Sequence, residues 1–131
     1  MFSRRQFLAA SAATGFASLA SGALAAEHYT FDAGAFAAAQ KAGRAILVDV
    51  SAPWCPTCQV QKPILEGLLS KPELKNLVVF EVDFDSRKDV LRALNVRSQS
   101  TLIVYKGAAE MGRSVGDTNP ASIAALLGKL A

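Results

Sequence analysis

The chain has 131 residues, of which 51% are hydrophobic and 19% are charged, so it is long enough for one domain with a hydrophobic core and too short for two. Its formal net charge is +3, but two of the 14 basic residues, Arg4 and Arg5, lie in an N-terminal leader, and the remaining 12 nearly balance the 11 acidic residues. Because this balanced part has no basic stripe, the composition gives no support to nucleic-acid binding.

The first 25 residues have the pattern of a cleaved export signal. Arg4 and Arg5 are followed by an apolar run over residues 7–20 and by Ala-Leu-Ala at residues 23–25, which is an A-x-A cleavage pattern. The run is too short and too rich in Ala, Gly and Ser to be a convincing membrane span. We therefore expect residues 1–25 to be removed, residues 26–131 to form the mature domain, and no membrane anchor to remain.

The start of this leader is more specific. Ser3-Arg4-Arg5-Gln6-Phe7-Leu8 resembles the twin-arginine export signal S-R-R-x-F-L, with Ala9 where a Lys usually follows. A general secretory signal that happens to contain two arginines is the alternative. The resemblance implies a bacterial protein that crosses the membrane already folded and works in the periplasm.

Beyond the leader, helix-like and strand-like patterns alternate. Apolar runs bounded by turn residues predict strands, and longer amphipathic or Ala-rich segments predict helices. Asn119 or Thr118 can cap the last helix, with Pro120 at its first position. The expected elements are a helix at 33–42, a strand at 45–50, a helix at 55–70, a strand at 77–84, a helix at 87–94, strands at 101–106 and 110–115, and a helix at 120–130. This order predicts an α/β domain with a mixed central β-sheet flanked by helices on both faces.

The strands at 45–50 and 77–84 are almost continuously apolar, as expected for strands that are buried on both faces. Three acidic residues interrupt them and need an explanation: Asp49, Glu81 and Asp83. In the helix at 55–70 we expect a kink at Pro63. Its apolar face is expected to comprise Val60, Ile64, Leu65, Leu68 and Leu69.

Both cysteines of the chain lie in Cys55-Pro56-Thr57-Cys58. Two cysteines at this spacing can form a redox pair, a small structural disulfide or half of a metal site. A zinc site needs four ligands, and His28 is the only histidine. The redox interpretation has physical support, because Cys55 follows a strand and opens a helix, where unpaired N–H groups and the helix dipole stabilise a thiolate. Cys58, one turn further on, is placed to resolve a mixed disulfide.

The segment Trp54-Cys55-Pro56-Thr57-Cys58, preceded by Val48-Asp49-Val50, is similar to the active site of the thioredoxin family. The similarity covers nearly all of residues 27–131. It includes Pro63, Val82-Asp83-Phe84-Asp85, the segment 96–102, Lys106-Gly107 and Val115-Gly116. It implies a thioredoxin-like fold and a thiol–disulfide oxidoreductase that needs no cofactor or metal and acts as a monomer. It also implies catalytic roles for Cys55, Cys58 and Asp49. The implied substrate-binding residues are Trp54, Pro56, Thr57, Gln99, Ser100 and Thr101.

One departure from the family pattern is Ser100, which stands where thioredoxins have a cis-proline before the residue that aligns with Thr101. A cis bond before a residue other than proline costs about 2.5–4 kcal/mol, so the Gln99–Ser100 bond is either trans in a reshaped loop or cis under strain. Within the family, loss of this proline also looks permissive for an iron–sulfur cluster, for which a dimer would supply four thiolates.

The second departure is Glu81, which aligns with a lysine that usually lies near the buried acid, here Asp49. If both acids face one pocket, their like charges should raise at least one pKa and favour a proton-carrying Asp49 beneath Cys58. Alternatively, Glu81 leans to the sheet edge and is hydrated.

The direction of electron flow does not follow from the fold. The absence of an inserted helical domain favours a reductase or thiol-exchange role over strong oxidation. The expected partners are disulfide-containing exported proteins and a membrane thiol electron donor, with no nucleic acid. A metal- or cluster-binding module that uses the same cysteine pair without turnover is the alternative.

Overall fold

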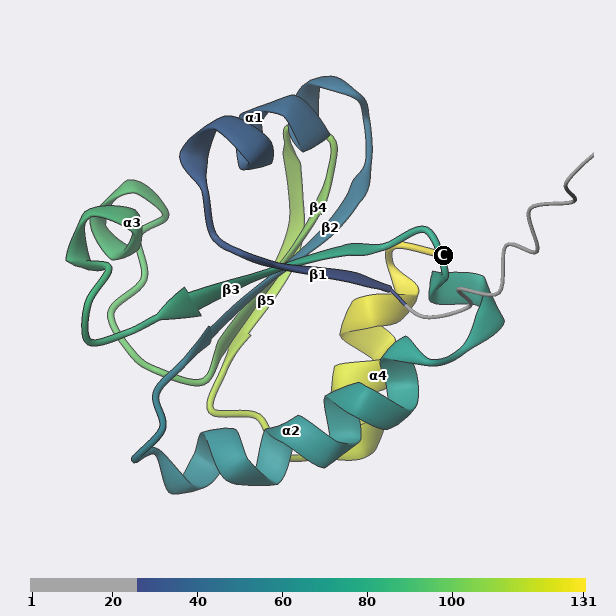
Figure 1. Ribbon diagram of the computed structural model, residues 1–131. Helices are drawn as coiled ribbons and strands as arrows, with labels where there is room; N and C mark the ends of the chain where they lie inside the picture. Colours follow the sequence, from purple (N-terminus) through teal and green to yellow (C-terminus); the bar gives the residue numbers. More distant parts are fainter. Residues whose placement is uncertain (1–25) are drawn as a thin grey trace, which may run out of the picture.

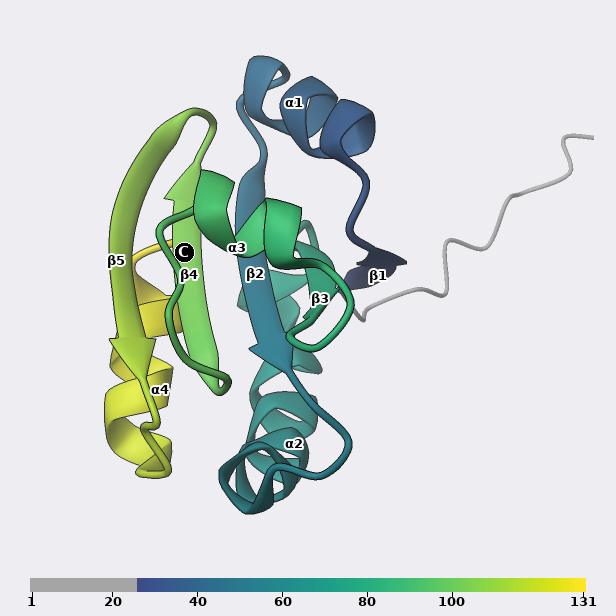
Figure 2. The same ribbon diagram turned by 90° about the vertical axis from the view of Figure 1, so that its left-hand side faces the viewer.

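A computed structural model describes residues 26–131 as a five-stranded sheet with two helices on each face (Figure 1). The elements in chain order are β1 (Glu27–Thr30), α1 (Ala33–Lys41), β2 (Ala45–Ser51), α2 (Pro56–Leu69), a 3-10 turn (Pro72–Leu74), β3 (Val78–Asp83), α3 (Lys88–Ala93), β4 (Thr101–Lys106), β5 (Ala109–Val115) and α4 (Pro120–Gly128). The strand order is β1-β3-β2-β4-β5, as Figure 2 shows. Because β1, β3 and β2 are parallel and β4 and β5 are antiparallel to their neighbours, the predicted mixed α/β sheet is confirmed.

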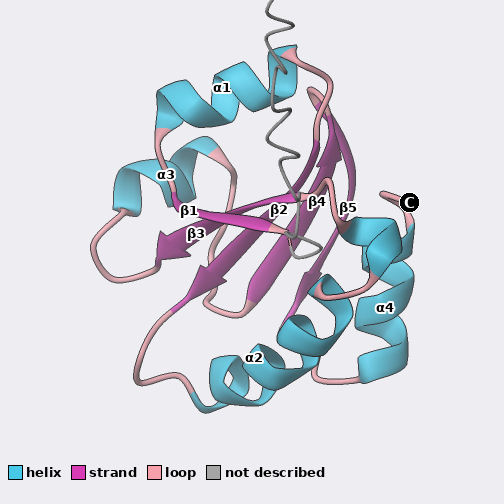
Figure 3. Cartoon of the chain, turned by 45° about the vertical axis from the view of Figure 1, so that its right-hand side comes forward, coloured by secondary structure: helices cyan, strands magenta, loops and turns pink. Residues whose placement is uncertain are grey.

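The two sheet faces bury two separate clusters, since successive side chains of a strand point to opposite faces. In β2, Ile46 and Val48 pack with α1 and α3, whereas Leu47 packs with α2 and α4. Figure 3 shows these helix pairs on opposite sides of the sheet. The same alternation carries Asp49, two residues after Leu47, to the α2 side, and Glu81, two residues after Val79, to the same side. Asp49 and Glu81, two of the acidic residues that interrupt the apolar strands, therefore lie on the same face of the sheet.

The edge strand β1 was not predicted. Its sequence, Glu-His-Tyr-Thr, has no apolar run, and all four residues are exposed. It is held by parallel pairing of its backbone with β3, where Glu27 pairs with Val78 and Thr30 with Glu81. Hydrophobic patterning cannot detect a strand whose main stabilisation is backbone hydrogen bonding.

The apolar face expected for α2 was partly wrong. Val60 is 50% exposed, and the buried positions are Cys58, Gln61, Leu65 and Leu69. These four are spaced by three or four residues, as one face of a helix requires, and Val60 lies off that face. The helix continues through Pro63.

The last helix begins as expected. The Asn119 side-chain oxygen accepts hydrogen bonds from the backbone N–H groups of Ala121 and Ser122, and Pro120 occupies the first turn. The export signal expected at residues 1–25, with its twin-arginine pattern, lies outside the described residues. Over residues 26–131, the helices are all too short or too polar to cross a membrane.

Candidate active site

Cys55 caps the N-terminus of α2 with its sulfur. Its backbone is extended (φ −81°, ψ 114°), and its Sγ accepts a hydrogen bond of 3.1 Å from the backbone N–H of Cys58. Pro56 fills the first helical position, where no N–H is needed. The sulfur thus takes the place of the oxygen acceptor that usually caps a helix, at the end where the dipole favours negative charge.

The Ser100 hydroxyl contacts both cysteine sulfurs. Its Oγ lies 3.2 Å from Cys55 Sγ and 3.0 Å from Cys58 Sγ. All three residues are buried, with exposed fractions of 1% for Ser100, 1% for Cys55 and 7% for Cys58. The residue that replaces the family's proline is therefore part of the sulfur site itself.

The Gln99–Ser100 peptide bond is trans, as are all peptide bonds in the described residues. Ser100 instead adopts a positive φ of 63°. Its N–H donates to the Val50 carbonyl at 2.8 Å, and its carbonyl accepts from the Gly116 N–H at 3.0 Å and from Gln61 Nε2 at 3.3 Å. A proline has neither this N–H nor access to this φ, so the loop is reshaped around serine.

The two thiols have unlike acidities. Burial acts to raise the pKa of Cys55, but hydrogen bonds from Cys58, Ser100 and the backbone of Cys58 and Thr57 together hold that pKa below its ordinary value. Burial and the neighbouring Cys55 raise the pKa of Cys58 above its ordinary value. This asymmetry makes Cys55 the more acidic of the two thiols, and therefore the one that ionises first.

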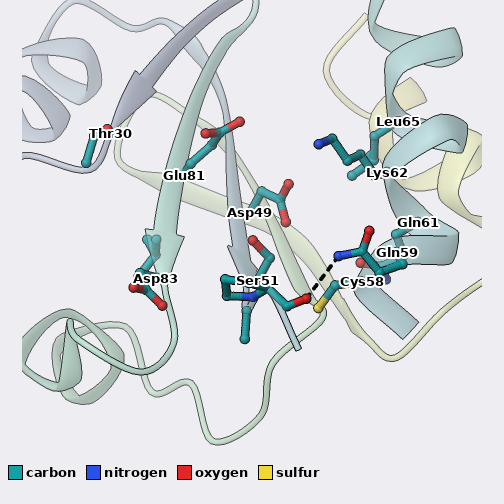
Figure 4. A pocket seen from close by; sticks show the side chains of 13 residues that line it. Thr30, Asp49, Ser51, Cys58, Gln59, Gln61, Lys62, Leu65, Glu81 and Asp83 are labelled. Atoms are coloured by element: carbon teal, nitrogen blue, oxygen red, sulfur yellow. Dashed lines mark hydrogen bonds between the residues drawn. The ribbon is translucent and has the colours of Figure 1, made fainter. Parts of the chain in front are cut away.

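Beneath Cys58 lies a pocket of about 470 Å³ between α2 and the strands β2 and β3. Asp49 and Glu81, paired in register on these strands, line it, and Figure 4 shows Lys62 projecting into it from α2. Burial, and then the negative charge of Glu81, raises the pKa of Asp49 to about 6, against the opposing effect of His28.

Glu81 both faces the pocket of Asp49 and is hydrated, so each of the two expectations for it is correct in part. It lines the pocket with Asp49, yet its side chain is 58% exposed, and its Oε1 lies 3.4 Å from Nδ1 of His28 on β1. Glu81 is therefore hydrated and still acts on Asp49 through its charge. His28 is itself exposed and lies beside Glu81 at the edge of the sheet.

The remaining expected substrate-binding residues differ in accessibility. Trp54 is 57% exposed, and its Nε1–H donates to Asp85 Oδ2 at 2.7 Å, which fixes the ring beside Cys55. Pro56 is exposed, whereas Thr57 and Gln99 are half-buried. Thr101 is 1% exposed, and its hydroxyl donates to the Ser98 carbonyl at 2.7 Å, so its side chain supports the loop from inside.

Gln61 was missed by the sequence analysis. It is 2% exposed, and its Nε2 donates to the carbonyls of Ser100 at 3.3 Å and Asp117 at 2.7 Å. It thereby ties α2 to the Ser100 loop and to the loop before α4. The sequence contained a hint of this role. Gln61 is polar, yet it lies three residues after Cys58 and four before Leu65, which is the spacing of the buried face of the helix.

Residues 26–131 contain no group of three or more His, Cys, Asp or Glu side chains placed to hold a metal ion. A cluster would therefore have to take more thiolates from a second chain.

The family model for thioredoxin matches residues 28–129. Thioredoxin of Chlamydia trachomatis serovar D is 36% identical over 84 residues, which cover 64% of this chain and 80% of that protein. Thioredoxin of Coprinus comatus is 33% identical over 87 residues, covering 66% and 81%. The crystal structure of Trxlp from Edwardsiella tarda EIB202 superposes with a TM-score of 0.75 at 40% identity, covering 77% of this chain and 98% of that one.

Proposed function

The chain belongs to the thioredoxin family and is a thioredoxin-like disulfide oxidoreductase with a Cys55–Cys58 pair, and from this premise we propose that it reduces or exchanges disulfides in exported partner proteins. One observation carries the proposal: Cys55 Sγ caps α2, within hydrogen-bond distance of the Cys58 N–H and the Ser100 hydroxyl. Such a site favours a nucleophilic thiolate at neutral pH.

The reaction follows from the unequal acidities of the two thiols. The Cys55 thiolate attacks one sulfur of a partner's disulfide, a mixed disulfide forms, and the other partner sulfur leaves as a thiolate. Cys58 then loses its proton and attacks Cys55 Sγ. A Cys55–Cys58 disulfide forms and the second partner thiolate leaves, so two electrons pass from the pair to the partner.

Asp49 receives the proton of Cys58 in this scheme. Both residues line the pocket beneath the site, and a carboxyl with a pKa of about 6 exchanges protons efficiently near neutral pH. The pocket opens to solvent at Glu81, so the proton has an exit that does not cross the substrate side.

Substrate recognition is assigned to the surface around Cys55. Trp54 offers an exposed apolar ring, Pro56 is exposed beside Cys55 in the chain, and Gln99 and Thr57 are half-buried neighbours in sequence of Ser100 and Cys58. A monomer suffices for this arrangement, because every group of the scheme belongs to one chain. A membrane thiol donor would return the pair to the dithiol, and neither nucleic acid nor a cofactor takes part.

In this proposal the protein works in the periplasm, after export by the twin-arginine route and removal of residues 1–25. The support is the S-R-R-x-F-L pattern of residues 3–8 and the Ala-Leu-Ala at 23–25. Replacing Arg4 and Arg5 by lysine should leave the uncut precursor in the cytoplasm of fractionated cells. Normal export and cleavage of that variant would contradict the route.

Insulin reduction combined with a redox titration tests the activity and its direction. The wild-type domain should accelerate insulin reduction by dithiothreitol, Cys55→Ser should abolish the effect, and Cys58→Ser should accumulate a mixed disulfide with insulin. A wild-type protein without turnover, or a Cys58→Ser variant that traps nothing, would refute the proposal.

A further inference from the structure

We propose that the Ser100 hydroxyl is a catalytic hydrogen-bond switch, which donates first to the Cys55 thiolate and then to Cys58 as Cys58 becomes the attacking thiolate. This inference rests on the proposed disulfide exchange. Ser100 would act both in the attack by Cys55 on the partner and in the attack by Cys58 on the mixed disulfide. It would also shift the equilibrium between the reduced pair and the Cys55–Cys58 disulfide.

The geometry allows Ser100 to serve either sulfur without moving its heavy atoms. Its Oγ is 3.2 Å from Cys55 Sγ and 3.0 Å from Cys58 Sγ. A hydroxyl has one proton and two lone pairs, so it donates to one sulfur while it accepts from the other. In the reduced pair, the hydroxyl donates to the Cys55 thiolate and turns its lone pairs toward the Cys58 thiol. Once Cys55 is bound in the mixed disulfide, rotation of the O–H bond presents the proton to Cys58.

The backbone fixes the hydroxyl in this position. Hydrogen bonds join the N–H of Ser100 to Val50 and its carbonyl to Gly116 and Gln61, so β2, α2 and the end of β5 all hold residue 100. Ser100 is only 1% exposed, so its hydroxyl has little access to water. Among the described residues, the hydrogen-bond partners of this hydroxyl are the two cysteine sulfurs.

The conformation of Ser100 indicates that a side chain is needed there. At three other turns with positive φ the chain uses glycine: Gly43, Gly107 and Gly116. Asn95 also has a positive φ, but asparagine tolerates the left-handed region, whereas serine has no such preference. Ser100 therefore has a strained backbone conformation, with φ at 63°, while its hydroxyl contacts both sulfurs. Backbone strain of this kind is commonly found at functional sites.

The switch has a redox consequence. The hydrogen bond to a thiolate exists only in the reduced form, because neither sulfur carries a charge once the disulfide has formed. Ser100 therefore stabilises the dithiol and makes the pair a weaker reductant than the same site without the hydroxyl.

Two variants separate the hydroxyl from the backbone. Ser100→Ala removes the hydroxyl and keeps a side chain at positive φ, while Ser100→Gly removes it without strain. In both we expect about tenfold less Cys55 thiolate at neutral pH, read from the pH profile of iodoacetamide alkylation. We also expect about a tenfold shift toward the disulfide in equilibrium with glutathione, which is about 30 mV for a two-electron couple. The mixed disulfide with a peptide should resolve more slowly.

Ser114→Ala is the matched control, because the buried Ser114 hydroxyl has no hydrogen-bond partner in the described residues and the change should leave all three readouts as in the wild type. An unchanged alkylation profile and potential in both Ser100 variants would overturn the switch. So would a shift in the alanine variant alone, which would assign the effect to strain. Alkylation needs no protein substrate, so these results remain readable if insulin reduction fails and the proposed function with it.

Discussion

Asp49 and Glu81 are directly paired on the adjacent parallel strands β2 and β3, and both line the pocket that reaches Cys58. Two carboxylates side by side disfavour double ionisation, and here one of them is buried while the other is hydrated. The arrangement therefore raises the pKa of the buried Asp49, while Glu81 lies on the hydrated side with its Oε1 3.4 Å from Nδ1 of His28.

Replacing Glu81 by glutamine should lower the pKa of Asp49. The like charge is the second cause of its rise to about 6, and burial is the first, so the pKa should fall but stay above 3.8. The carboxyl carbon shift of Asp49, followed by NMR as a function of pH in the reduced protein, measures this change. His28→Gln is the opposing control and should raise the pKa, since His28 lowers it. A Glu81→Gln variant with the same or a higher Asp49 pKa would contradict the coupling.

Replacing Asp49 by asparagine should slow the resolution of the mixed disulfide on the order of 10–100-fold at pH 7, because Cys58 loses its proton acceptor. Substrate binding should change little, since Asp49 lies below the sulfurs, away from Trp54. Single-turnover decay of the mixed disulfide, compared with the KM for insulin, separates the two effects. Glu66→Gln removes an exposed acid from α2 and should decay at the wild-type rate. Equal decay rates for Asp49→Asn and wild type would remove Asp49 from the reaction.

The same substitution should stabilise the fold at neutral pH. Because the pKa of Asp49 is about 6 in the native state and 3.8 ordinarily, the native state binds more protons between these values, and wild-type stability falls as pH rises through that window. Asparagine does not titrate, so the variant should gain up to about 3 kcal/mol over wild type above pH 6 and nothing below pH 3.8. Urea unfolding at pH 3.5, 5 and 7.5 measures the difference. A gain independent of pH would point to packing instead of proton binding.

Much of this architecture could be predicted from residue patterns alone. The apolar runs that became β2 and β3 stand out because both faces of those strands are buried. Cys55 was expected at a helix N-terminus because it lies between the strand at 45–50 and an amphipathic segment. The strand β1 could not be found, since its stabilisation lies in backbone pairing. Ser100 was visible as a missing proline, but its contact with both sulfurs depends on a left-handed backbone that nothing local in the sequence encodes.

Gln61 is a further residue whose removal should be costly. Gln61→Leu keeps a similar volume but deletes the hydrogen bonds to the Ser100 and Asp117 carbonyls, of which the first lies in a buried setting. The Ser100 carbonyl keeps its hydrogen bond from the Gly116 N–H, so the Asp117 carbonyl is the acceptor that loses its partner. The change should cost about 1–3 kcal/mol of the free energy of unfolding. Gln59→Leu on the same helix deletes one exposed hydrogen bond to Pro53 and should cost less than about 1 kcal/mol. Urea denaturation of both variants measures the contrast. Equal losses at the two positions would show that the buried amide does not hold the Ser100 loop to α2.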